Sequence, residues 1–365
     1  MRAWADWAIQ FWQKYERRIN LAALVLGFSF DIVLARRPDS ALDNFLLLSY
    51  LVIAGAIIVS LNLRDRRVVD GHPVEPLVLL LILQFCFGGL ASNLLVLYGH
   101  SGTFSGSALF ILLLLGMLLG NEFLLGRYSL FYFNVAVYYL LLLTYCIIAV
   151  PTFIMHSVGW LAFMISCAAS VVVVVPFFLA LRASIRRGRR EQKLLWQARA
   201  IVGGILAAFM FFYFLNIIPP VPLSIKAIGI YHSLSKDAAG NYSAAFEQSH
   251  WWEFWRDTSG TYTRAPGSSA FCFSSVFAPA KLEAPVYHEW ERLNSQTNIW
   301  ESVSRIPFSI AGGRSEGYRG WSEITMLSPG EWRCNVETSS GALIGRISFT
   351  VVESSAPPAL SKTTL

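Results

Sequence analysis

Long apolar runs dominate the first 218 residues of the chain and do not occur after them. Each run is near the ~20 residues that an α-helix needs to cross a bilayer. The seven runs span 19–35, 42–63, 77–98, 104–125, 129–149, 157–181 and 201–218. This pattern predicts an α-helical membrane bundle of seven spans over residues 19–218.

Residues 1–18 combine aromatic residues at helical spacing with basic residues near the end, which predicts an amphipathic helix in the headgroup region of a membrane. A cleaved signal peptide ending near Ala35 is the alternative interpretation. Asp31 interrupts its apolar run, and removal of one span would break the alternation of charge between the loops. We therefore expect an uncleaved N-terminus.

The hydrophobic period changes from helical to alternating after residue 223. A proline-rich joint over 219–223, with Pro219, Pro220 and Pro222, ends the last span because proline cannot continue a helix. The short runs that follow are rich in β-branched and aromatic residues and are separated by turn-forming residues. They are Ser224–Leu234, Trp251–Arg256, Ala270–Phe277, Val286–Glu291, Ile299–Ile310, Tyr318–Met326, Glu331–Glu337 and Leu343–Val352.

Seven or eight strands over residues 224–353 predict an all-β antiparallel sandwich, of which the immunoglobulin fold is one form. Residues 354–365 are polar and are expected to form a disordered tail. The sequence thus predicts a membrane half, a stiff joint, a β domain and a tail.

Basic residues are distributed unevenly along the chain, which has a net charge of +6. With the N-terminus inside, cytoplasmic segments hold 15 Lys and Arg residues, and only Arg36 and Arg37 face outward. The positive-inside rule then predicts a cytoplasmic N-terminus and an exported C-terminal domain. From Pro220 onward the chain has 12 basic and 13 acidic residues, so this half has no excess of positive charge and we expect no binding to nucleic acid.

The five cysteines divide between the two halves. Cys86, Cys146 and Cys167 lie inside apolar spans and are expected to act as small hydrophobic residues. Cys272 and Cys334 lie in predicted strands of the exported domain, where an oxidising compartment permits a disulfide. Two buried free thiols are the alternative for this pair, because the sequence does not give the distance between them.

Polar residues inside the spans are candidates for function. Asp31 and Glu122 are the carboxylates among them, although structural pairing explains such residues as well as a transport path does. Gly116-x-x-x-Gly120 and Gly203-Gly204 allow close approach of helix backbones, which we expect within the bundle.

The sequence contains no convincing catalytic constellation. Gly313–Gly317 matches G-x-S-x-G, but a nucleophile elbow needs a later histidine, and the last one, His288, precedes this serine. The histidines show no metal-ligand spacing. We therefore expect neither an enzyme nor a cofactor nor a metal.

Tryptophan is concentrated in the exported domain, which holds seven of the twelve. Any single one is most simply a core residue, but so many predict an exposed aromatic surface as well. The candidate ligand-binding residues are His288, Trp290, Arg319 and Trp321, because they combine flat aromatic area, a guanidinium fork and a titratable ring.

Several motifs of the chain resemble those of one bacterial family. They are Asn216–Lys226, Cys272–Pro279, Tyr287–Trp290, Gly317–Ser322, Pro329–Arg333 and Gly345–Phe349, with Phe30-Asp31, Leu119–Phe123 and Arg127-Tyr128 in the membrane half. Together they look like the domain-of-unknown-function family numbered 2914. The resemblance implies a bacterial inner-membrane protein and covers nearly the whole chain, but it implies no mechanism.

These patterns lead to one functional expectation and one alternative. The expectation is a multi-pass inner-membrane protein whose periplasmic β-sandwich binds an envelope component, either a glycan or a protein. The alternative is a small-solute transporter or membrane sensor in which the sandwich is a regulatory domain.

Overall fold

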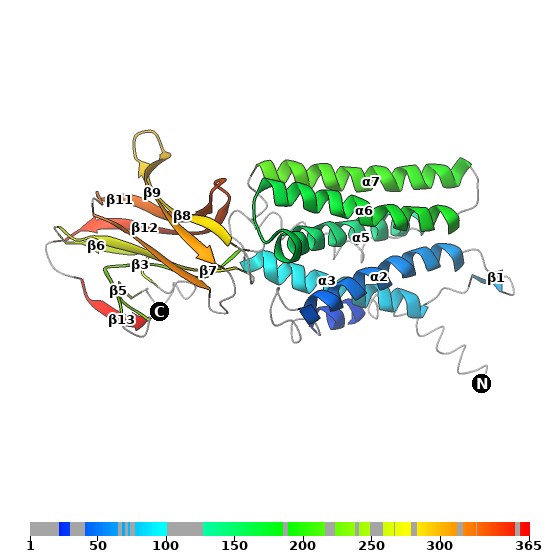
Figure 1. Cartoon of the computed structure of the whole chain (residues 1–365), viewed down its shortest axis with the longest axis horizontal. Coiled ribbons are helices and arrows are strands. Elements are labelled where there is room, and N and C mark those ends of the chain that lie inside the picture. The colour runs from blue at the N-terminus through cyan, green and yellow to red at the C-terminus, as the bar shows by residue number, and fades with distance from the viewer. Residues whose placement is uncertain are drawn as a thin grey trace. The chain divides into compact units, whose positions relative to one another are not determined.

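Helices form the first part of the chain and strands the second (Figure 1). The computed structural model describes residues 22–29, 41–64, 68–69, 72–73, 77–100, 127–184, 189–215, 223–237, 241–248, 258–265, 267–278, 283–311, 317–325, 327–354 and 358–365. The chain divides into a helical unit, which lies mainly before residue 219, and a β unit that lies mainly after it. The two units are described separately below.

The helical unit begins with a helix over residues 22–29. The elements that follow are α2 (Ala41–Arg64), the short strands β1 (Val68–Val69) and β2 (His72–Pro73), α3 (Leu77–His100), α5 (Arg127–Ala149), the π-helical segment η1 (Val150–Met155), α6 (Trp160–Ser184) and α7 (Arg189–Phe214). The basic stretch Arg182–Arg199 lies between the predicted spans 157–181 and 201–218, where a loop is expected, but residues 182–184 and 189–199 of it are helical.

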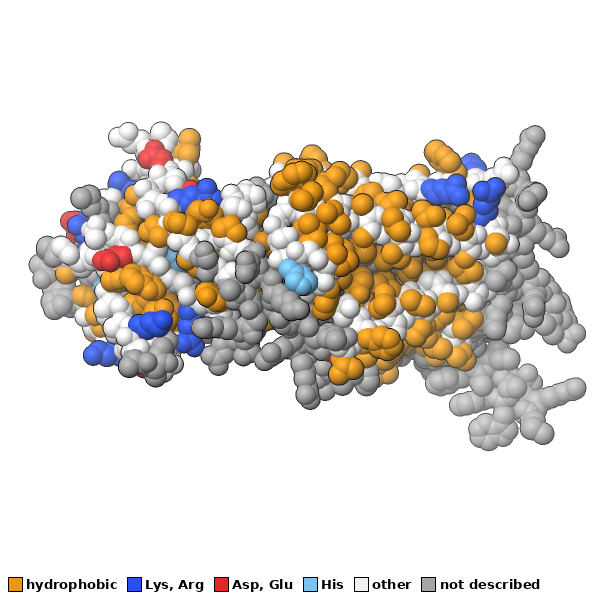
Figure 2. All heavy atoms as spheres, viewed as in Figure 1, with side chains coloured by type: hydrophobic (Ala, Val, Ile, Leu, Met, Phe, Trp, Pro, Cys, Tyr) orange, Lys and Arg blue, Asp and Glu red, His pale blue; other side chains and the backbone are white. Residues whose placement is uncertain are grey.

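Within the described residues, four helical segments are long and apolar enough to cross a membrane. They are Leu42–Asn62, Phe131–Met155, Trp160–Ser184 and Gln192–Phe214, and Val78–Ser92 is a shorter apolar stretch. Figure 2 shows apolar side chains over the visible face of the helices. The predicted span 104–125 and the helix over 1–18 lie outside the described residues, so the structure supports an apolar helical bundle but not the count of seven.

Helix α5 is the most deeply buried of these candidate spans. Within its most apolar stretch, 78% is buried, whereas the corresponding value for α7 is 22%. Tyrosines along α5 donate or share hydrogen bonds with three other helices: Tyr132 with Gln197, Tyr139 with Ser170 and Tyr145 with Asn44. Polar pairs of this kind can hold helices together where the hydrophobic effect offers no net attraction.

Close helix packing uses different glycines from those that the sequence suggested. A Cβ on Gly203 or Gly204 would meet nothing within 4 Å, so this pair mediates no close contact with the described helices. Instead, a Cβ on Gly88 of α3 would lie 2.1 Å from the carbonyl oxygen of Leu24, and one on Gly27 would lie 2.2 Å from that of Phe85. The predicted Gly116 and Gly120 lie outside the described residues.

The β unit consists of eleven described strands. They are β3 (Ser224–Tyr231), β4 (Ser233–Lys236), β5 (Tyr242–Glu247), β6 (Thr261–Arg264), β7 (Ala270–Phe277), β8 (Glu283–Asn294), β9 (Ile299–Ala311), β10 (Tyr318–Ile324), β11 (Gly330–Thr338), β12 (Leu343–Glu353) and β13 (Leu360–Thr364). The predicted strand over Trp251–Arg256 lies outside the described residues.

These strands form three sheets. The five-stranded sheet has the order β6-β12-β11-β8-β9, the middle sheet β10-β7-β3 and the small sheet β13-β5-β4. One apolar cluster joins the five-stranded sheet to the middle sheet, and a second, around Tyr231, Tyr242, Ala244 and Phe273, joins the middle sheet to the small sheet. The β7 strand of the middle sheet is consequently buried on both faces, as its nearly continuous apolar sequence requires.

The β unit departs from the predicted antiparallel sandwich in three respects. Strand β12 pairs with β6 in parallel. Residues 360–364, expected in a disordered tail, form β13 and pair with β5, because their alternating polar sequence suits an exposed sheet edge. The third sheet was not expected either, since β4, β5 and β13 are only four to six residues long.

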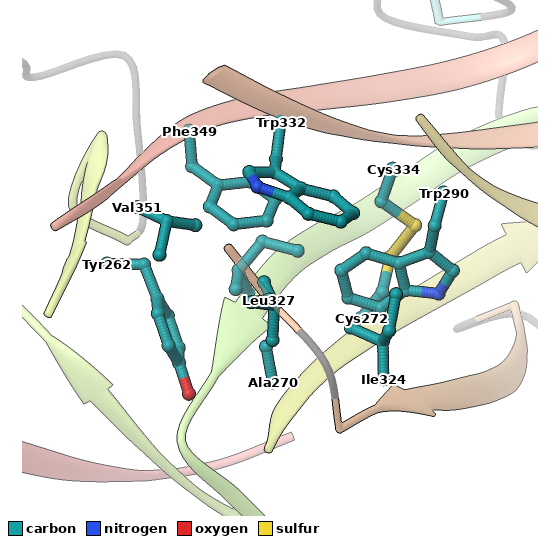
Figure 3. Packing of buried hydrophobic residues seen from close by; sticks show 11 residues of the cluster. Tyr262, Ala270, Cys272, Trp290, Ile324, Leu327, Trp332, Cys334, Phe349 and Val351 are labelled. Carbon is teal, nitrogen blue, oxygen red and sulfur yellow. A yellow bond between two sulfur atoms is a disulfide. The ribbon is translucent and has the colours of Figure 1, made fainter. Parts of the chain in front are cut away.

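The main core lies between the five-stranded and middle sheets (Figure 3). Trp290 and Trp332 are its largest fully buried side chains. A disulfide between Cys272 of β7 and Cys334 of β11 connects the two sheets, with the Cα atoms 6.7 Å apart. The structure therefore contains the bridge and not the alternative pair of free thiols.

Candidate functional site

Two of the four predicted ligand-binding residues are core residues. His288 and Trp290 lie on β8 with 0% of each side chain exposed. Both face the middle sheet, where Trp290 packs beside the disulfide in Figure 3. Neither side chain is available to a ligand on the surface of the folded domain.

His288 is held between two serines of the middle sheet. Its Nε2 lies 2.7 Å from Ser274 Oγ and its Nδ1 lies 2.9 Å from Ser322 Oγ. The indole N–H of Trp290 also donates to Ser322 Oγ, over 3.0 Å. Burial lowers the pKa of His288 to about 3, so the ring is neutral near pH 7 and both nitrogens are satisfied by hydroxyl groups.

Arg319 and Trp321 lie on the other face of the middle sheet. Strand β10 alternates, so Ser322 faces inward, and Trp321 faces outward with 45% of its surface exposed. Its ring centroid is 5.9 Å from that of Phe271. The sheet separates Trp321 from His288 and Trp290, so the four predicted residues do not form one patch. Asp31 and Glu122 lie outside the described residues.

A different set of residues forms the most developed polar surface of the β unit. It covers the outward side of four strands of the five-stranded sheet, and we call it the polar face. Its members are Tyr287, Glu289, Glu291, Trp300, Arg305, Arg333, Asn335, Glu337 and Arg346.

Strand register places these side chains in rows that run across the sheet. One row runs from Arg305 through Glu289 and Asn335 to Arg346, because these residues are direct partners on β9, β8, β11 and β12. In the next row, Glu291 of β8 is the partner of Arg333 of β11. Facing pairs in a sheet are close enough for direct side-chain contact.

Hydrogen bonds connect the two rows. Glu291 Oε2 accepts hydrogen bonds from Arg333 Nε and from Asn335 Nδ2, the latter over 2.5 Å. Asn335 Oδ1 in turn accepts a bond of 2.6 Å from Arg346 Nε. Asn335 is 1% exposed, so the charged groups around it form a covered network and not a set of freely solvated side chains.

Two guanidinium groups of this face also lie over aromatic rings. Arg333 Cζ is 4.1 Å from the ring centroid of Trp300, and Arg305 Cζ is 4.3 Å from that of Tyr287. Such stacking restricts a guanidinium group and leaves its N–H groups in the plane to donate to acceptors, as Arg333 does to Glu291 and Arg305 does to the carbonyl oxygen of Thr338.

Glu337 has an unusual protonation. Burial, a hydrogen bond to Glu289 and the negative charges of Glu289 and Glu291 raise its pKa to about 7, although Arg305 opposes the shift. Arg305 Nε lies 3.9 Å from Glu289 Oε2. The carboxyl group of Glu337 can therefore act as a hydrogen-bond donor at neutral pH, next to a carboxylate that accepts.

The polar face was not predicted from the sequence. Outward-facing polar residues are ordinary on a sheet that faces water, so neither Glu289 nor Glu291 alone indicates a functional site. The available signal was their spacing: acidic residues two apart on one predicted strand, and Arg333, Asn335 and Glu337 two apart on another. Residues two apart share a face of a strand.

The polar face coincides with the part of the chain that a known family covers. Residues 283–351 match the model of a family described as "Protein of unknown function (DUF2914)". Residues 283–351 are therefore a DUF2914 region. The matched residues begin with β8 and end within β12, so every member of the polar face lies in the DUF2914 region. The helical unit lies outside the match.

Other comparisons add little to the DUF2914 assignment. No curated protein matches the chain. A β-glucosidase from Kluyveromyces marxianus is 12% identical, with 42% of this chain and 18% of that chain covered and a TM-score of 0.17. The Pseudomonas fluorescens alkylpurine DNA glycosylase AlkC, bound to DNA containing an abasic site analog, is 9% identical, with coverages of 73% and 96% and a TM-score of 0.19. TM-scores this low establish neither fold nor function.

Proposed function

We propose that this DUF2914 protein is a multi-pass bacterial inner-membrane protein whose periplasmic β domain binds an envelope component, a glycan or a protein, through the polar face. The membrane part of the proposal rests on the four apolar helices of the described chain and on the seven apolar runs of the sequence. The orientation rests on the excess of basic residues in the loops assigned to the cytoplasm.

The observation that carries the binding proposal is the covered network of charged groups in the polar face. Three carboxyl groups and three guanidinium groups are arranged there in rows by strand register. Arg333 has only 17% of its side chain exposed and Glu291 only 15%. Oriented donors and acceptors of this kind suit the hydroxyl and amide groups of a glycan or an extended peptide.

Binding to the full-length protein in nanodiscs would test this function. The probes are muropeptides of defined composition, lipopolysaccharide, and a panel of purified periplasmic domains. We expect one class to bind, and we expect Arg333→Gln to weaken binding about tenfold or more, because it removes a charged hydrogen-bond donor and leaves Glu291 less well paired.

Arg292→Gln is the matched control, because Arg292 is an exposed arginine on the same strand as Glu291 but with the opposite orientation. It should bind like the unmodified protein. Failure of every probe to bind would contradict the proposed function. An equal loss of binding affinity in both variants would show that the polar face is not the binding surface.

A further inference from the structure

Three potential metal ligands meet in the core of the β unit. The Sγ atoms of Cys272 and Cys334 and a ring nitrogen of His288 all lie within 4.8 Å of one another. The sequence gives no indication of this cluster, because the three residues come from three different strands and have no short spacing. Strand pairing brings them together.

The surrounding ladders fix the positions of all three residues. Cys272 is the direct partner of Ser322 on β10 and of Ile230 on β3, and Cys334 is the direct partner of Trp290 on β8. The three ligand residues are each 0% exposed. The cluster therefore has a scaffold on both sheets that does not depend on the disulfide alone.

His288 already has the environment that a metal-binding histidine requires. Its two nitrogens contact Ser274 Oγ and Ser322 Oγ, so one can bind a metal while the other keeps its hydroxyl partner. Such an outer hydrogen bond orients the ring and fixes its tautomer in metal sites.

We propose that Cys272, His288 and Cys334 form a Zn²⁺ site when their disulfide is reduced. Two thiolates and one imidazole bind Zn²⁺ in preference to Mg²⁺ or Ca²⁺, because the latter two ions take oxygen ligands. These residues supply three of the four positions of a tetrahedral site. A water molecule or one of the serine hydroxyl groups that contact His288 would complete the tetrahedron.

The reaction that opens the site is a thiol–disulfide exchange with a protein dithiol as reductant. The dithiol gives two electrons and two protons, the bond between Cys272 and Cys334 breaks, and the reductant becomes a disulfide. Zn²⁺ then replaces the two thiol protons, which are released to solvent. The oxidised protein has no thiolates at this position, so bridge formation and metal binding exclude each other.

Cobalt binding to the full-length protein in detergent would test the proposal, because thiolate ligands give Co²⁺ a charge-transfer absorption. The background variant is C86A/C146A/C167A, which removes the three other cysteines of the chain. After reduction and anaerobic removal of the reductant, we expect one Co²⁺ per chain, displaced by Zn²⁺. The oxidised protein should give no such absorption.

Two further variants make the test specific. His288→Gln should weaken Co²⁺ binding by at least ~10–100-fold, the range found when only an outer partner of a ligand is lost. Adding C272A and C334A to the background should abolish the absorption. A reduced, folded protein with two labelled thiols but no cobalt absorption would overturn the proposal, and so would loss of the β-sheet circular dichroism on reduction.

Discussion

At the scale of single residues, exposure separates two tryptophans that look equivalent in the sequence. Trp290 is 0% exposed and Trp321 is 45% exposed, although both alternate with polar residues in predicted strands. Alternation identifies the two faces of a strand but not which face another sheet covers. The position of the middle sheet decides which face is buried, and that position depends on contacts between residues far apart in the chain.

This difference gives the first prediction. Trp290→Ala should destabilise the β unit by ~3–5 kcal/mol, because it empties a fully packed site and removes the indole donor to Ser322. Trp321→Ala should cost only about 1–2 kcal/mol, since the indole is partly in solvent. Thermal unfolding of the full-length protein, followed by β-sheet circular dichroism, measures both. Similar losses in the two variants would show that Trp321 is packed more deeply than the structure has it.

The second prediction concerns Glu337. Its pKa is raised from 4.5 to about 7 in the folded protein, so the folded state holds a proton that the unfolded state has lost between these values. The stabilising contribution is present below pH 4.5 and is lost as the pH rises through 7. Glu337→Gln should therefore stabilise the protein relative to wild type more at pH 8 than at pH 5.

Thermal melting of wild type and variant between pH 5 and pH 8 checks this result. Glu323→Gln, which changes an exposed carboxyl on β10, is the control and should shift the melting temperature little at either pH. A pH-independent difference between wild type and Glu337→Gln would contradict the raised pKa.

At the scale of elements, the sequence predicts the long strands well and the short ones poorly. The predicted strand Ala270–Phe277 coincides with β7, because a strand buried on both faces has a continuous apolar sequence with clear ends. Strands β5, β6 and β13 were missed, because Ala, Ser, Thr and Lys dominate them and their pairing partners lie elsewhere in the chain. Propensity is weak for strands that tertiary contacts create.

The third prediction uses the glycines of the helical unit. Gly88→Ala should destabilise the bundle by ~1–3 kcal/mol, because its Cβ would lie 2.1 Å from a backbone oxygen that cannot easily move. Gly203→Ala, which meets nothing within 4 Å, should be neutral or slightly stabilising. Melting temperature and yield in detergent measure the contrast. An equal loss of stability in Gly203→Ala would show that another helix packs against the face of α7 that carries Gly203.

At the scale of the whole molecule, the sequence predicts the division into an apolar helical part and a β part. The change of hydrophobic period after residue 223 reflects the change from helices to strands, and so is visible without any contact information. The polar face was not predictable in the same way, because it depends on strand register across four strands. The described residues contain four helices that are long and apolar enough to cross a membrane, and the number of spans stays a prediction.

The fourth prediction is the topology. Reporter fusions after Gly188 should score as cytoplasmic and fusions after Lys226 as periplasmic, because seven basic residues lie around the first position and an apolar helix separates the two. A cytoplasmic score after Lys226 would invert the orientation and remove the β domain from the envelope.

The placement of β7 has a consequence for amide hydrogen exchange. Both edges of this strand are paired, with β3 and β10, and both of its faces are covered by another sheet. Its backbone amides can therefore reach deuterated solvent only when the whole β unit opens. Their exchange rate reports the global free energy of unfolding of that unit, whereas the edge strands β9 and β13 exchange through smaller local openings.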